Sequence, residues 1–207
     1  MATQALAVNG AKVYICGRTE EKLETVAQTY SKDISGQIIP ITCDISKKDE
    51  IASLYDQISS KEKHLDILIN NAGIQFNSYQ WEARSADEMK ANLFEPKEAT
   101  FEEWTDEYRT NVSPLWFTSV CFLPLLQKAS EATHGWSGTI VNITSISGQV
   151  KTTQHHAQYN ASKAAAIHVT RMLANEVQAN GLKIRINNIA PGMLPPKSSY
   201  RNHMANL

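Results

Sequence analysis

Strand-like runs alternate with segments of helical periodicity along this chain, and that alternation limits the fold more than any other feature. The five runs rich in β-branched residues cover residues 12–16, 37–43, 65–69, 138–143 and 183–189. Helical periodicity separates most of them, over residues 19–30, 47–60, 101–128 and 158–180. Strands that alternate with helices form parallel βαβ units. We therefore expect an α/β fold with a doubly wound, Rossmann-like parallel sheet.

Three residues mark where the helices should begin, bend or end. Thr19 is expected to cap the helix of residues 19–30, since a threonine oxygen can accept from a free backbone N–H group. Pro114 should bend the helix of residues 101–128, because proline removes a backbone donor. Gly181 should close the helix of residues 158–180.

Residues 75–100 differ from the rest of the chain. They are polar, rich in charge and without periodicity, which predicts a loop insertion. No internal repeat and no clear linker interrupts the sequence elsewhere. We therefore predict a single domain over residues 1–207, with an insertion at residues 75–100.

Composition argues against several classes of partner. The net charge of −1 gives no field that would recruit nucleic acid or an anionic membrane. No uninterrupted apolar run approaches the roughly 20 residues that a membrane span requires. The three cysteines are an odd, widely spaced set, which suits reduced thiols, and the N-terminus has no secretory signal. These features predict a cytoplasmic protein.

Tyr159 and Lys163 are the strongest sign of chemistry. They are four residues apart in a predicted helix, so they share one face. A lysine ammonium one turn away favours the phenolate form of a tyrosine, which can then serve as a proton donor and acceptor. The spacing alone is common by chance, and the plain alternative is a surface pair on an amphipathic helix.

Further polar residues follow the ends of strands, where ligands bind in such sheets. Ser145 and Ser147 follow the fourth strand, and either hydroxyl could polarise a substrate carbonyl. Asn70-Asn71-Ala72-Gly73 follows the third strand, and Pro191-Gly192 follows the fifth. Each of these is also an ordinary turn signal by itself.

His155 and His156 precede Tyr159 directly. They either contact substrate or are simple loop histidines. No cysteine or carboxylate stands at metal-ligand spacing from them, so we expect no metal.

The joint order of these motifs resembles the short-chain dehydrogenase/reductase family over almost the whole chain. The matching motifs are Cys43-Asp44-Ile45, Asn70-Asn71-Ala72-Gly73, Asn111-Val112, Asn142-Ile143-Thr144-Ser145, Tyr159-Asn160-Ala161-Ser162-Lys163 and Pro191-Gly192. The charged insertion is similar to that of fungal members and of some β-ketoacyl reductases. The resemblance implies an NAD(P)H-dependent oxidoreductase that acts on a small ketone or secondary alcohol.

The resemblance also implies catalytic roles. Tyr159 would be the general acid in reduction, and Lys163 would hold the nicotinamide ribose. Ser145 would orient the carbonyl, because the family serine is followed three residues later by a glycine, here Gly148. Asn111 would anchor a water that links Lys163 to solvent.

The implied cofactor site draws on several loops. Asp44 would contact the adenine, and Asn71, Ala72 and Gly73 would line the adenosine side, while Pro191 and Gly192 would complete the site. Arg18 stands where NAD-preferring relatives carry an acidic residue. A guanidinium suits a 2′-phosphate, so NADP(H) is favoured over NAD(H). The alternative is that Arg18 is a solvated charge near the start of the helix. Relatives also imply a homo-oligomer formed through residues 101–128 and 158–180.

The sequence departs from the family pattern at both ends, and these departures suggest alternatives to an active oxidoreductase. The family's first strand and glycine-rich turn are missing, because residues 1–13 match the later part of its first helix and the approach to its second strand. After Pro191-Gly192 the usual threonine, substrate-loop helix and last strand are missing too. We therefore expect a member truncated at both ends. A catalytically silent isoform or pseudoenzyme is one alternative, and a non-enzymatic nucleotide-binding module is another.

Overall fold

The computed structural model describes residues 1–192 of the chain, which divide into two compact units. The first unit is Met1–Lys63 and the second begins at His64. The sequence predicted one domain, whereas each unit has its own parallel sheet. The expectations about residues after Gly192, including the missing threonine and last strand, lie outside the described residues.

The first unit is built on two parallel strands. Its elements are α1 (Ala2–Val8), β1 (Lys12–Gly17), α2 (Glu20–Tyr30), β2 (Gln37–Thr42) and α3 (Lys48–Ser59). The strands pair from Lys12 opposite Gln37 to Gly17 opposite Thr42, so both end at one edge of the sheet. Thr19 stands at the predicted N-cap of α2, but its hydroxyl makes no capping hydrogen bond.

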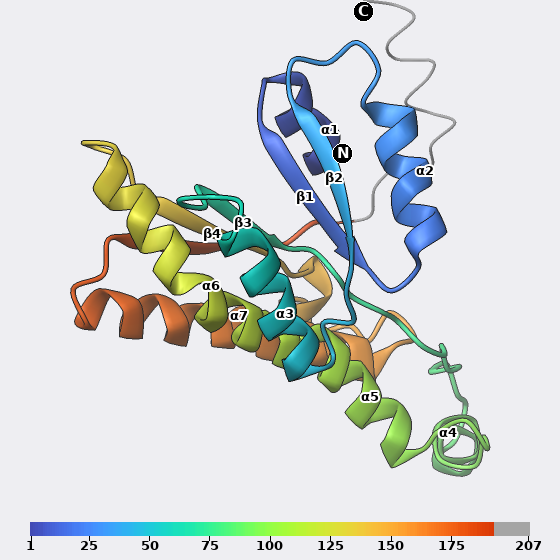
Figure 1. Cartoon of the computed structure of the whole chain (residues 1–207). Coiled ribbons are helices and arrows are strands. Elements are labelled where there is room, and N and C mark those ends of the chain that lie inside the picture. The colour runs from blue at the N-terminus through green and yellow to red at the C-terminus, as the bar shows by residue number, and fades with distance from the viewer. Residues whose placement is uncertain (193–207) are drawn as a thin grey trace, which may run out of the picture. The chain divides into compact units, whose positions relative to one another are not determined.

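The second unit holds a three-stranded parallel sheet in the order β3-β4-β5. Figure 1 traces its elements in chain order. They are β3 (Ile67–Asn70), α4 (Ala86–Leu93), α5 (Phe101–Asn111), α6 (Ser113–Ala132), β4 (Gly138–Ile143), the 3₁₀ turn η1 (Ile146–Gly148), α7 (Ala157–Ala179) and β5 (Ile184–Ile189). Helix α6 packs on β3 and β4, and α7 packs on β5 and along α6.

The core of the second unit follows from this packing. Phe122, Leu125 and Leu126 of α6 and Ile140 of β4 are fully buried, and burial of such side chains stabilises the fold by about 1.5–3 kcal/mol each. An amide pair joins the strands in this core, where Asn70 donates to Asn142 at 2.8 Å. These contacts fix the carboxyl ends of the strands.

The α/β class with parallel strands is confirmed, but the strands pair as two sheets. Among residues 1–192, β1 pairs with β2 alone and β3 with β4 alone. Within the same residues, no helix is both long and apolar enough to span a membrane.

Two helix predictions need correction. The predicted insertion contains α4, because Ser85 accepts a hydrogen bond from Glu88 N, and the Glu88 carboxylate accepts from Arg84 N. This is close to a capping box, a known helix start signal. The predicted bend of the long helix is a break at Val112, and Pro114 lies in the first turn of α6.

Candidate active site

A cavity of about 320 Å³ lies where β3, β4 and β5 end, in the second unit. It is lined by Asn71, Gly73, Ile74, Gln75, Ile143, Thr144, Ser145, Tyr159, Lys163, Pro191 and Gly192. Seven of these were predicted from the sequence as site residues. Three loops and one helix therefore bring seven of the predicted residues of the second unit to one place.

Tyr159 and Lys163 lie on the first turns of α7, on one face of the helix. The Lys163 Nζ lies 5.6 Å from the centroid of the Tyr159 ring and donates to the carbonyl of Ile143 at 3.1 Å. Lys163 is only 4% exposed. Burial lowers the pKa of Lys163, and Glu107 opposes that effect.

The two candidate serines have different surroundings. Ser145 lines the cavity, and its hydroxyl oxygen accepts from Ser147 N at the start of η1. The Ser147 hydroxyl donates instead to Gln154 Oε1 at 2.7 Å. The geometry therefore favours Ser145 as the serine that faces a ligand.

Gly148 explains how Ser145 and Lys163 come close. A Cβ at Gly148 would lie 2.6 Å from both Ala164 N and Lys163 C, far inside contact distance. Only glycine therefore lets η1 pack this tightly on the backbone of α7.

Asn111 lies directly behind the cavity and is buried. Its amide exchanges two hydrogen bonds with the backbone of Ile74, at 2.8 and 2.9 Å, and donates a third to Ser162 Oγ. A Cβ at Gly73 would lie 3.2 Å from Asn111 Oδ1 and 3.3 Å from Lys163 Nζ. Asn111 thus joins the end of β3 to the helix that carries Tyr159.

Two buried glutamates on α5 were missed by the sequence reasoning. Glu107 Oε1 accepts from Phe76 N at 3.2 Å, and Glu103 accepts from Asn77 N and from the Tyr79 hydroxyl. Acids are seldom fully buried, and their partners lie 24 to 31 residues earlier in the chain. The available signal was their spacing, since 103, 107 and 111 share one helix face.

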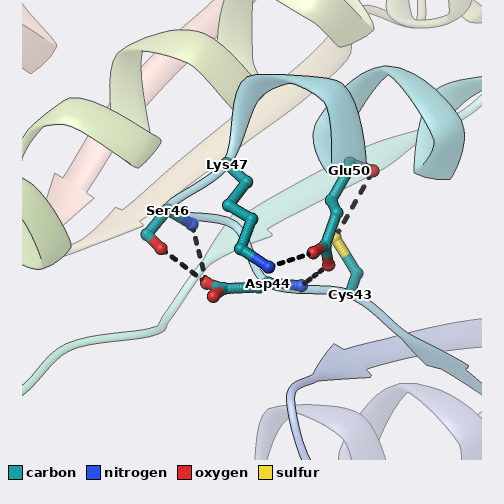
Figure 2. Close-up of polar contacts among 5 residues, drawn as sticks. All are labelled: Cys43, Asp44, Ser46, Lys47 and Glu50. Atoms are coloured by element: carbon teal, nitrogen blue, oxygen red, sulfur yellow. Dashed lines mark hydrogen bonds and ion pairs between the residues drawn. The ribbon is translucent and has the colours of Figure 1, made fainter.

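Arg18 and Asp44 lie in the first unit and follow β1 and β2. Figure 2 shows how Asp44 is held: its carboxylate accepts from Ser46 Oγ at 2.7 Å and from Ser46 N at 3.0 Å. Its own N–H donates to Glu50 Oε2. The Ser46 hydrogen bonds are the main reason that the pKa of Asp44 is lowered, and the charges of Lys47 and Arg18 add to it.

Ala72, His155 and His156 do not line the cavity either. Ala72 is exposed beside it. His155 bonds Tyr79 O through its ring, and His156 packs its ring edge against Tyr159, with 5.3 Å between the centroids. Neither histidine is among the described lining residues. Over residues 1–192 no group of three His, Cys, Asp or Glu side chains is placed to hold a metal.

A larger cavity of about 750 Å³ lies at the opposite end of β4, near Trp136 and Lys183. Ligands in open α/β sheets bind at the carboxyl ends of the strands. The smaller cavity holds Ser145, Tyr159 and Lys163, so we regard that one as the site of chemistry.

Known proteins resemble this chain in sequence and in fold. The sequence profile of a family described as short chain dehydrogenase matches residues 1–202. The short-chain dehydrogenase/reductase PhomF′ of Diaporthe leptostromiformis is 32% identical over 198 residues. That match covers 94% of this chain, and the chain spans 65% of the length of that relative.

Solved structures give the same result. The RhlG active-site complex with NADP from Pseudomonas aeruginosa has a TM-score of 0.74 and 27% identity, covering 99% of this chain and 70% of that one. A variant of actinorhodin polyketide ketoreductase with NADPH has a TM-score of 0.73 and 26% identity, with coverage of 99% and 70%.

Proposed function

Since the chain belongs to the short-chain dehydrogenase family, we propose that it is an NAD(P)H-dependent oxidoreductase that reduces a ketone to a secondary alcohol. One observation carries the proposal: Ser145, Tyr159 and Lys163 line one cavity at the carboxyl ends of three parallel strands. The polyketide ketoreductase among the similar structures supports a ketone as the substrate class.

The residues around the cavity fit a nicotinamide cofactor. The Lys163 ammonium is buried and has three donors, of which one is used by Ile143 O. Such a group suits ribose hydroxyls. Gly192 is open, since a Cβ there would meet nothing within 4 Å, so a ligand can approach its backbone. A bound nicotinamide would supply the hydride.

The chain's own side chains supply the proton and the polarisation. The Tyr159 hydroxyl gives its proton to the carbonyl oxygen of the substrate, and the Ser145 hydroxyl donates a hydrogen bond to the same oxygen. Lys163 places a positive charge beside the Tyr159 ring, which stabilises the phenolate left behind. Asn111 acts from behind by fixing Ile74 and Ser162.

Replacement of Tyr159 by phenylalanine tests the catalytic role. We expect ketone reduction to fall about 10²–10⁴-fold, while NADPH binding, followed by fluorescence titration, is kept. Tyr30→Phe is the matched control, because Tyr30 is exposed at the end of α2. Full activity in Tyr159→Phe would favour the non-enzymatic nucleotide-binding alternative. A purified chain that binds no NADPH would instead support the catalytically silent alternative.

NADP(H) is the proposed cofactor over NAD(H), with Arg18 as the residue that recognises the 2′-phosphate. Arg18 follows β1, and its charge acts on the Asp44 carboxylate. Asp44 is the residue expected to contact the adenine, so this position supports a role for Arg18 at the adenosine end of the cofactor. Arg18→Ala should weaken NADPH binding about 10–100-fold, as expected for loss of a charged hydrogen bond, and leave NADH binding little changed. An equal loss for both cofactors would contradict this role.

Association of copies through α5, α6 and α7 is also part of the proposal. Exposed apolar side chains support it, since Trp104, Tyr108, Trp116 and Val120 on α5 and α6 and Met172 on α7 are each more than a third exposed. Light scattering of the purified chain decides between a monomer and an oligomer, and Trp116→Glu should shift an oligomer toward the monomer.

A further inference from the structure

We propose that Glu107 is a positioning residue that sets the charge of Lys163, and through Lys163 the charge that faces Tyr159. This inference rests on the proposed function of the Tyr159 and Lys163 pair. It goes beyond that function because it adds a titrating group that touches neither substrate nor cofactor.

The first argument is that Glu107 is a buried acid whose hydrogen bonding is incomplete. The residue is 0% exposed. One carboxylate oxygen accepts from Phe76 N at 3.2 Å, while Oε2 is buried without a hydrogen-bond partner among the described residues. A buried polar atom without a partner is costly. Holding the 74–79 segment therefore explains one of its two oxygens only.

The second argument is the position of Glu107 on α5. It lies one helical turn before Asn111, on the same face. Asn111 Oδ1 and Lys163 Nζ both lie within 3.3 Å of one point above Gly73. Helix α5 packs against α7, so Glu107, Asn111 and Lys163 are buried polar residues of two neighbouring helices, and Lys163 Nζ lies 5.6 Å from the Tyr159 ring centroid.

The third argument is electrostatic. Burial raises the pKa of Glu107 to about 7, with Glu103 adding to the rise and Lys163 opposing it. The pKa of Lys163 is lowered by burial and raised by Glu107. Glu103 from α5, Lys163 from α7 and the Phe76 N–H from the 74–79 segment are the groups that act on Glu107. Ionisation of Glu107 therefore stabilises the Lys163 ammonium.

The test measures Lys163 directly by NMR, in protein labelled with ¹³C and ¹⁵N lysine. The loss of one signal in Lys163→Met assigns the resonance. In the wild type, the Lys163 signal should show an inflection near neutral pH, from Glu107, and a second one from its own ionisation. Glu107→Gln keeps an oxygen for Phe76 N, so it should remove the first inflection and move the second to lower pH.

Glu103→Gln is the matched control. It removes a carboxylate one turn earlier on the same helix, but both oxygens of Glu103 have hydrogen-bond partners, and the pKa of Lys163 is shifted by burial and by Glu107. Both Lys163 inflections should therefore persist, with the first at lower pH, because Glu103 raises the pKa of Glu107. If Glu107→Gln leaves both in place as well, Glu107 is an anchor for Phe76 and the proposal is wrong.

A second measurement covers the case in which Glu107→Gln does not fold. Wild-type protein labelled at the glutamate carboxyl carbon should show one carboxyl that titrates near neutrality, and none above pH 6 would overturn the proposal. These readouts need no turnover. An inactive chain with the expected Lys163 titration would therefore refute the proposed function and leave the Glu107 proposal standing. In an active enzyme, Glu107→Gln should also remove the ionisation of Glu107 from the pH profile of ketone reduction, whereas Glu103→Gln should keep it and move it to lower pH.

Discussion

Replacement of Gly148 by alanine tests the link between the fold and the candidate site. The new Cβ would lie 2.6 Å from Ala164 N and Lys163 C and 2.9 Å from Lys163 O. All three are backbone atoms of α7, so no flexible side chain can move aside. Relief requires η1 to shift away from the helix. Overpacking of this kind costs about 1–3 kcal/mol.

Urea unfolding is the assay for this prediction. With a denaturant slope of about 2 kcal/mol/M for a chain of this size, the midpoint should fall by roughly 0.5–1.5 M. The shift of η1 also carries Ser145 away from Lys163. Ketone reduction should therefore fall even without urea, where the protein remains folded.

Gly192→Ala is the control, because a Cβ at Gly192 would meet nothing within 4 Å. Its stability should stay within about 0.5 kcal/mol of the wild type. A Gly148→Ala protein as stable as the Gly192→Ala control would refute the close approach of η1 and α7. It would also refute the reason given for a glycine at position 148.

Three further predictions concern local stability and pH. Ser85→Ala should destabilise α4 by about 1 kcal/mol, seen as faster hydrogen exchange in that helix, and unchanged exchange would contradict the cap. Asn142→Ala should cost about 1–3 kcal/mol in urea unfolding, since it strips partners from Asn70 and Thr170, and a neutral effect would refute the buried network. Burial raises the pKa of Glu107 from 4.5 to about 7, so the folded state holds this proton more tightly. Stability should fall by on the order of 3 kcal/mol as pH rises through that window, and Glu107→Gln should flatten the fall if this carboxyl causes it.

The strands and the catalytic pair were accessible from the sequence because their signals are local. The fourth strand has the predicted bounds, Gly138–Ile143, since a β-branched run follows a glycine there. Tyr159 and Lys163 lie on one helix face because four residues make about one turn. The start of α4 was local too, since Ser85 and Glu88 have the spacing of a capping box, and that signal was overlooked.

Other features depend on contacts between distant parts of the chain. Ser145 and Ser147 follow the same strand, and only the folded turn, in which Ser147 bonds Gln154, separates them. Glu107 looks like a solvent-facing acid on an amphipathic helix, because nothing nearby in sequence reveals that Phe76 N will meet it. The division into two units likewise depends on which strands pair with one another. That pairing cannot be read from the sequence of each strand alone.

The hydrogen bonds between α5 and the 74–79 segment have a consequence for chain length. From Glu103 to Asn111 the helix rises about 12 Å, and the three residue-to-residue steps from Ile74 to Asn77 span at most about 10–11 Å. The two lengths nearly match, so three side chains can hold three amides in a single register. Deleting one residue between Gly73 and Asn77 would shorten the segment by about 3.3–3.6 Å, so at least one of these amides would move out of hydrogen-bonding distance of its acceptor. Related proteins should therefore vary in length after Tyr79, around α4, and keep a fixed residue count before it.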